Sequence, residues 1–184
     1  EVDILVCDDG LQHLAMARDV EICVFDERGT GNGRLLPAGP LREPWPRRVD
    51  LVLQPAGTAV DPAGFGLMRA IASHALRADG TRVPLADLAR AATEGGPVLW
   101  AMAGIAHPER FFGMLRARGL PLAGTRALPD HAPSAAFDWP QAGAGLLLCT
   151  EKDAAKLRSL RPDALAVPLE LTIAPAFWPA LQDC

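Results

Sequence analysis

The stretch that most constrains the fold is VDILVCDDG, residues 2–10, in which an apolar run ends at Asp8, Asp9 and Gly10. A short β-branched run of this kind is typical of a buried strand, because it is too short for a core helix. Ligands of open α/β sheets bind at the carboxyl ends of strands, where a carboxylate can hold Mg²⁺ that bridges nucleotide phosphates. Asp8 and Asp9 therefore have the form of a Walker B element. A simple turn with an aspartate cap is the alternative.

Further along the chain, short apolar runs alternate with segments of helical spacing. The runs predict strands at residues 21–25, 49–53, 98–102, 146–149 and 165–171, and helices at 85–92, 108–118 and 153–160. Pro108 at the first helical position and Gly119 just past the last support the second helix. This alternation predicts an α/β fold with a mostly parallel sheet covered by helices.

Residues 29–46 are rich in Gly and Pro, which predicts a loop or linker. The prolines between Pro37 and Pro46 give the best boundary between two α/β units. We therefore expect a first unit at residues 1–40, a Pro-rich hinge at 41–48, and a second domain at 49–184.

A Walker B element requires a P-loop of the form GxxxxGK[ST], and this chain has none. Its lysines are Lys152 and Lys156, and neither follows a glycine. Either the Walker B interpretation is wrong or the P-loop lies upstream of Glu1. Because the chain opens without Met, directly before an apolar run, we expect a truncated product.

Composition excludes several classes of protein. The 184 residues carry a net charge of −4, so no basic excess is present to neutralise nucleic-acid phosphates. The four cysteines form no CxxC pair, which indicates a reducing compartment without a disulfide framework. No apolar run reaches the roughly 18 residues that a membrane span needs, and no signal peptide is present. We expect this piece of chain to be soluble.

Five blocks, in order, resemble motifs of the lipid A 4'-kinases (tetraacyldisaccharide 4'-kinases). The blocks are DDGLQH at residues 8–13 with RD at 18–19, GNGRLLPAGPLREP at 31–44, AGI at 103–105 followed by P and RFF at 108 and 110–112, PDH at 129–131, and TEKDAAKL at 150–157. One block alone would be weak, but five in the right order are very specific. Together they span residues 8 to about 157.

The resemblance implies a P-loop NTPase-like sheet, of which this chain has a remnant, and a second, smaller Rossmann-like α/β domain joined by a hinge. It implies transfer of the ATP γ-phosphate, with Mg²⁺, to the 4'-hydroxyl of a tetraacylated disaccharide 1-phosphate, giving lipid IVA in the lipid A biosynthesis of Gram-negative bacteria. Members of the family sit peripherally at the cytoplasmic face of the inner membrane, partly through an N-terminal hydrophobic helix. That segment and the P-loop are absent from this sequence, so we expect the piece alone to be inactive.

The DDGLQH block carries the implied nucleotide site. Asp8 and Asp9 match the acidic pair that positions Mg²⁺ and nucleotide, with Asp9 also implied in catalysis, and either of them can be the direct metal ligand. Gln12 and His13 match the residues that lie near the phosphates. For His13, a purely structural hydrogen-bonding role is an equal alternative.

The other blocks supply implied substrate and catalytic residues. Arg42 suits a phosphate in two-point contact, with a salt bridge to Glu43 as the alternative. Asn32 lies between two glycines that allow close approach of the backbone to a substrate, although a plain turn explains it too. His131 matches the histidine that helps to activate the sugar hydroxyl from the second domain. The residues after it, from Ala132, depart from the family pattern.

A rival hypothesis makes the chain a non-catalytic α/β module that binds a ligand or partner. Under it, Asp8 to Gly10 is only a turn. A GxxxxGK[ST] motif roughly a hundred residues upstream of Glu1 would favour the kinase, and its absence would favour the module.

Overall fold

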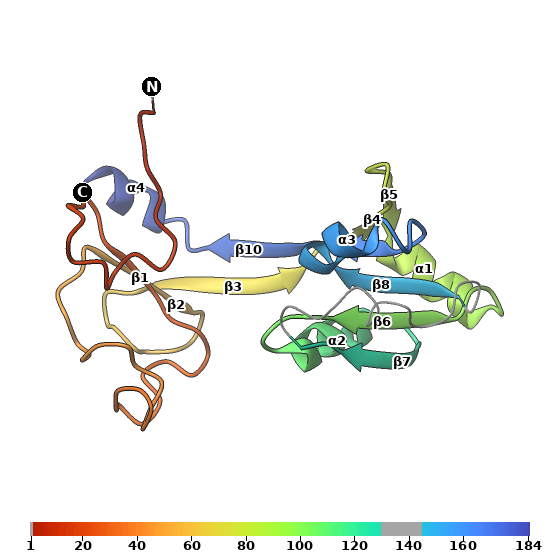
Figure 1. Cartoon of the computed structure of the whole chain (residues 1–184), viewed down its shortest axis with the longest axis horizontal. Coiled ribbons are helices and arrows are strands. Elements are labelled where there is room, and N and C mark those ends of the chain that lie inside the picture. Colours follow the sequence, from red (N-terminus) through yellow and green to blue (C-terminus); the bar gives the residue numbers. More distant parts are fainter. Residues whose placement is uncertain (1, 130–144) are drawn as a thin grey trace. The chain divides into compact units, whose positions relative to one another are not determined.

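The structure, a computed structural model, describes residues 2–129 and 145–184, and it divides into two compact units. The first unit comprises Glu1–Met68 and Leu171–Cys184, and the second comprises Arg69–Glu170. Strands β3 (Phe65–Ile71) and β10 (Leu169–Ile173) are neighbours in one sheet and run in opposite directions (Figure 1). Both strands continue from one unit into the other, so the chain crosses between the units twice.

The first unit is built on a four-stranded sheet in the order β1-β2-β3-β10, with β1 at Ile22–Val24 and β2 at Leu51–Pro55. Strands β1, β2 and β3 are parallel. Alternate residues of β2 face opposite sides. Leu51 and Leu53 pack against Phe177 of helix α4 (Phe177–Gln182), whereas Val52 packs on the other face. The expected strands at 21–25 and 49–53 are thus confirmed within a residue or two.

The Gly- and Pro-rich residues 29–46 form a loop, as expected, but they are packed within the first unit. Leu41 is buried with Phe25 and Val52, and Trp45 packs edge-on against Phe25 with ring centroids 4.8 Å apart. Segments that contribute core side chains to a unit cannot serve as a free hinge. The structural division at 68/69 and 170/171 therefore differs from the expected 41–48 hinge.

The strand predicted at residues 2–7 is wrong for this structure. The segment has no regular secondary structure, and Val2, Ile4, Leu5 and Val6 are 77–88% exposed. A strand is held by its neighbours, and among the described residues this segment pairs with none. The segment is apolar, but the side chains of these four residues are not buried against any other part of the described chain and stay exposed.

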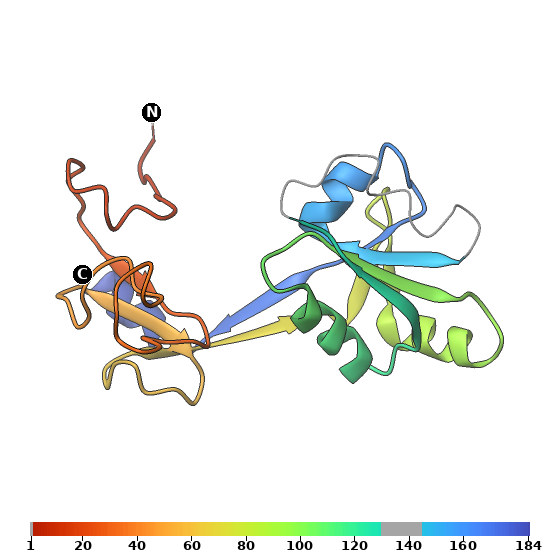
Figure 2. The same ribbon diagram turned by 60° about the horizontal axis from the view of Figure 1, so that its bottom comes forward.

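The second unit contains a six-stranded sheet in the order β5-β4-β9-β8-β6-β7. The strands and helices are β4 (His74–Leu76), β5 (Arg82–Pro84), α1 (Leu85–Thr93), β6 (Leu99–Ala103), α2 (Pro108–Ala117), β7 (Leu122–Ala127), β8 (Leu146–Thr150), α3 (Glu151–Leu157) and β9 (Leu165–Val167). Strands β9, β8, β6 and β7 are parallel, whereas β4 pairs antiparallel with both β5 and β9. Figure 2 shows the same elements from a second direction.

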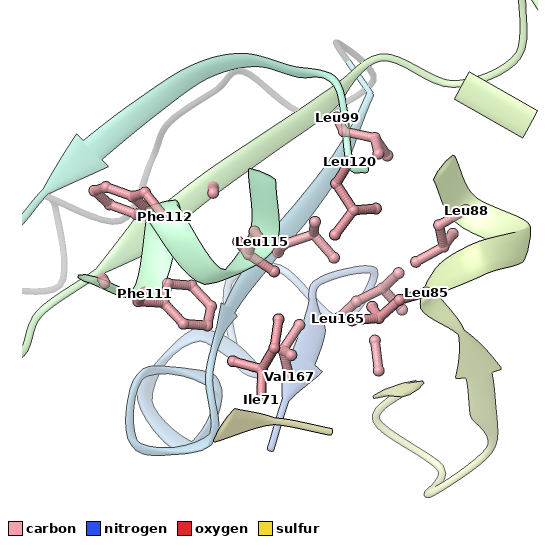
Figure 3. Close-up of a cluster of buried hydrophobic side chains, with 14 residues drawn as sticks. Ile71, Leu85, Leu88, Leu99, Phe111, Phe112, Leu115, Leu120, Leu165 and Val167 are labelled. Carbon is pink, nitrogen blue, oxygen red and sulfur yellow. The ribbon is translucent and has the colours of Figure 1, made fainter. Parts of the chain in front are cut away.

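Helices cover both faces of this sheet, as expected for a Rossmann-like domain. Leu99, Ala101 and Ala103 of β6 face the larger core, which contains Leu85 and Leu88 of α1 and Phe111, Phe112 and Leu115 of α2. Figure 3 shows the leucine and phenylalanine side chains of this group gathered with Ile71, Leu165 and Val167. The intervening Met102 faces the smaller core, where α3 contributes Ala154 and Leu157. The two-residue period of β6 thus serves two helical layers.

The run expected as one strand at 165–171 is two strands, β9 and β10, separated by Pro168. Proline has no N–H to donate to a ladder, although its carbonyl still accepts from the Ala72 amide at 2.9 Å. At this point the chain leaves the sheet of the second unit and joins β3.

Among the described residues, no helix has the length and apolar character needed to cross a bilayer.

Asp153 links two strand ends inside the second unit. The residue is 1% exposed, and its Oδ2 accepts hydrogen bonds from the Gly104 amide at 3.0 Å and the Thr150 hydroxyl at 2.6 Å. Thr150 is also the N-cap of α3 and accepts from the Asp153 amide. Asp153 therefore ties the residue that follows β6 to the start of α3, next to β8.

We expect Asp153→Ala to lower the free energy of unfolding by about 2–4 kcal/mol, because it leaves the buried Gly104 N–H without its acceptor. Denaturant unfolding followed by circular dichroism at 222 nm measures this change. The matched control is Glu151→Ala, an exposed residue of the same helix turn, which should cost less than about 1 kcal/mol. Equal losses in the two variants would contradict the structural role given to Asp153.

Candidate functional site

Asp8 and Asp9 lie in a turn that follows the irregular residues 2–7. Asp9 has a φ of +53°, the left-handed conformation that Asp and Asn tolerate better than other residues with a side chain. The next turn is closed by the His13 amide, which donates to the Gly10 carbonyl at 3.0 Å. The backbone thus doubles back directly after the acidic pair.

The second acidic residue meets an arginine from 33 residues further along the chain. Arg42 Nη2 lies 3.3 Å from Asp9 Oδ2, and the two side chains are 57% and 74% exposed. The alternative pairing of Arg42 with Glu43 is not what the structure shows. Two residues that the sequence singled out separately, one from each block, are therefore neighbours in the first unit.

Glu43 serves the same turn through a different contact. Its Oε1 accepts from Gln12 Nε2 at 2.7 Å, and its Oε2 pairs with Arg47 Nη1 at 2.8 Å. Burial of the Glu43 carboxyl acts to raise its pKa, but hydrogen bonds from Arg47 and Gln12 outweigh burial and hold the pKa below its ordinary value. Glu43 is thus ionised at neutral pH, and these contacts weaken only as the pH falls through its lowered pKa.

Asn32 organises its own loop. Its Nδ2 donates to the Ala38 carbonyl at 2.8 Å, and its Oδ1 accepts from the Arg34 amide at 3.1 Å. Gly39 packs so closely here that a Cβ would overlap Asn32 Oδ1 and the Arg34 carbonyl. Within the described part of the chain, no hydrogen bond joins Asn32 to Asp9 or Arg42, so the turn-forming role is the one that the geometry supports.

The carboxylate oxygens of Asp8 and Asp9 are suitable ligands for a Mg²⁺ ion that also binds nucleotide phosphates. Mg²⁺ usually keeps several waters and takes only one or two protein carboxylates beside the phosphates. Asp8 has no hydrogen-bond or ion-pair partner within residues 2–129 and 145–184, and the Asp9 carboxylate is largely open to solvent. In that part of the chain, no group of three or more His, Cys, Asp or Glu residues is placed to hold a metal ion.

His131, and Asp130 before it, fall outside the described residues. An open hollow of about 490 Å³ in the first unit is lined by residues 16–19, Glu21 and residues 48–50, so its lining includes Arg18 but not the acidic pair.

The comparison with protein families decides the relationship. The model of the family described as LpxK, tetraacyldisaccharide-1-P 4'-kinase, matches residues 1–184. The chain belongs to this family. The resemblance to the tetraacyldisaccharide 4'-kinases that was drawn from the five blocks is thereby confirmed.

Relatives and a solved structure agree with this family. The chain is 56% identical to a tetraacyldisaccharide 4'-kinase of Verminephrobacter eiseniae, over 99% of this chain and 41% of the relative. It is 55% identical to one of an Acidovorax species, over 98% and 52%. The chain thus spans about half the length of these relatives. A crystal structure of Aquifex aeolicus LpxK in complex with ATP matches with a TM-score of 0.71 at 24% identity, over 94% of this chain and 54% of that one, which confirms the α/β fold.

Sequence reasoning missed how the site of this 4'-kinase family member is supported. In the sequence, Arg18 stands out only as part of a motif and Glu21 only as the start of an expected strand, and no pattern singles out Arg47. The structure places all three around the turn at residues 10–13. Their pairing joins residues up to 26 positions apart, so no local sequence pattern could have shown it.

Proposed function

We propose that the chain is part of a kinase that transfers the γ-phosphate of ATP to the 4'-hydroxyl of tetraacyldisaccharide 1-phosphate. The family match across all 184 residues carries this proposal. The contact between Asp9 and Arg42 supports it, because it joins an acidic residue suited to Mg²⁺ with a guanidinium suited to a phosphate. Since the relatives are about twice as long, the activity belongs to a full-length polypeptide, meaning this chain joined to the remaining half of their length.

Within that polypeptide, Asp8 and Asp9 would hold the metal, and Asp9 would also take part in catalysis. Bound Mg²⁺ would neutralise charge on the nucleotide phosphates. Gln12, fixed by Glu43, and His13 orient groups near those phosphates. Arg42 balances the Asp9 carboxylate and is exposed enough to donate to a phosphate oxygen as well. Asn32 shapes the loop that approaches the acceptor.

His131 is proposed as the residue that shares a proton with the attacking sugar hydroxyl. A histidine near its ordinary pKa exchanges protons at neutral pH, which suits that task. The acceptor is amphiphilic, so the enzyme is proposed to work at the cytoplasmic face of the inner membrane. The acceptor and this membrane surface are the partners that we propose.

Because the sequence holds no GxxxxGK[ST], we expect the 184-residue chain alone to show no ATP-dependent turnover. The assay combines the chain, Mg-ATP and tetraacyldisaccharide 1-phosphate, and follows ADP release. The full-length polypeptide in the same assay should release ADP only when the acceptor is present. Acceptor-dependent turnover by the short chain would contradict the proposed need for a separate P-loop, and no turnover by the long one would contradict the kinase proposal.

A further inference from the structure

Arg18 makes an unusual number of contacts with the backbone of the turn that carries Gln12 and His13. Its Nη1 lies 2.9 Å from the Gly10 carbonyl oxygen, 3.2 Å from that of Leu11 and 3.5 Å from that of His13. The first of these carbonyls also accepts the His13 amide. One guanidinium therefore gathers the carbonyls that a turn normally leaves to solvent.

The guanidinium is itself held by a chain of alternating charges. Arg18 Nη2 pairs with Glu21 Oε1 at 2.8 Å, and the other carboxylate oxygen of Glu21 pairs with Arg47. Arg47 in turn pairs with Glu43, which accepts from Gln12. The hydrogen bonds that Arg47 donates to the carboxylates of Glu43 and Glu21 raise the pKa of Arg47.

This chain of charges begins and ends on the same turn. It starts at the carbonyls of residues 10–13 and returns to the Gln12 side chain, so it fixes both the backbone and one side chain. The side chains of Arg18, Glu21 and Arg47 are only 19–20% exposed, which screens their charges less than at an open surface. Such a closed arrangement opposes rotation of the turn as a whole.

We infer that Arg18 is a positioning residue, which holds the turn after the acidic pair in the shape needed at the phosphates, and this inference rests on the proposed kinase function. An arginine is required because its planar fork bonds carbonyls through one nitrogen and a carboxylate through another. A lysine has a single nitrogen and cannot span the same set of acceptors. The role is indirect, since Arg18 acts through Gln12, His13 and the backbone between them.

The test uses Arg18→Gln and Arg18→Lys in the full-length polypeptide, with Arg28→Gln as the matched control. Arg28 also pairs with a nearby carboxylate, that of Asp26 at 2.7 Å, but it is 61% exposed and does not touch the turn. We expect Arg18→Gln to lower kcat by about 10–100-fold, as for loss of a supporting contact, with the acceptor KM nearly unchanged. Arg18→Lys should recover part of the loss, and Arg28→Gln should match the wild type.

Amide hydrogen exchange on the same preparations gives a readout that is independent of catalysis. The amides of residues 13 and 14 should exchange faster in Arg18→Gln than in Arg28→Gln, whereas amides of the second-unit core should not change. Wild-type kinetics and exchange in Arg18→Gln would overturn the inference. If the wild type itself lacks kinase activity, the proposed function fails, and the exchange comparison alone then decides whether Arg18 holds the turn.

Discussion

Replacing Asp9 by Asn in the full-length polypeptide is expected to lower kcat by about 10²–10³-fold, comparable to loss of one electrostatic group in an active site. The change removes the charge that we assign to Mg²⁺, while Asn tolerates the left-handed backbone that Asp9 adopts. The Mg²⁺ concentration that gives half-maximal activity should rise at the same time. Steady-state kinetics over a Mg²⁺ series measures both effects.

Two variants separate charge from backbone shape in this experiment. Asp9→Ala removes the charge and also strains the backbone, so it should be at least as damaging as Asp9→Asn. Asp26→Asn removes a carboxylate from another exposed arginine pair of the same unit, and it should leave kcat and the Mg²⁺ dependence unchanged. If Asp9→Asn retained wild-type kcat across the series, Asp9 would not be the metal residue.

His131→Ala in the full-length polypeptide is expected to lower kcat by about 10²–10⁴-fold, the usual cost of losing a general acid or base. The reason is that the sugar hydroxyl must lose a proton as it attacks, and we assign a share of that proton to His131. The measurement is kcat together with KM for both ATP and acceptor, over a range of pH. A general-base role also predicts that the wild-type profile has a limb near the pKa of histidine, which the variant lacks.

The division between kcat and KM decides the role of His131. A loss confined to kcat places the residue in the chemical step. A loss seen mainly in the acceptor KM would make it a binding residue instead. His74→Ala is a suitable control, because that histidine lies in β4 and belongs to none of the family blocks.

The second unit was largely predictable from the sequence, because the apolar residues that mark its strands and helices are the ones buried in its cores. β6, β8, α1 and α2 appear within one or two residues of the expected bounds, since their apolar residues alternate or repeat with helical spacing. β4, β5 and β7 were missed. β4 and β5 are only three residues long, and little in β5 or β7 is buried.

The first unit shows where local patterns are insufficient. Residues 2–7 read as a strand, but a strand depends on neighbours that a local window does not contain. Residues 41–48 read as a hinge from their prolines, yet Leu41 and Trp45 bind the segment to the core. The pairing of Asp9 with Arg42 also joins residues 33 positions apart, and only the fold reveals it.

The position of the new phosphate tests the central proposal most directly. The full-length polypeptide is incubated with Mg-ATP and tetraacyldisaccharide 1-phosphate, and the lipid product is analysed by phosphorus–proton correlation NMR. The account predicts a second phosphorus signal that correlates with the proton at the 4' carbon. A new phosphate at any other hydroxyl would contradict it. So would an acceptor that stays unchanged although the polypeptide is folded and ATP is still present.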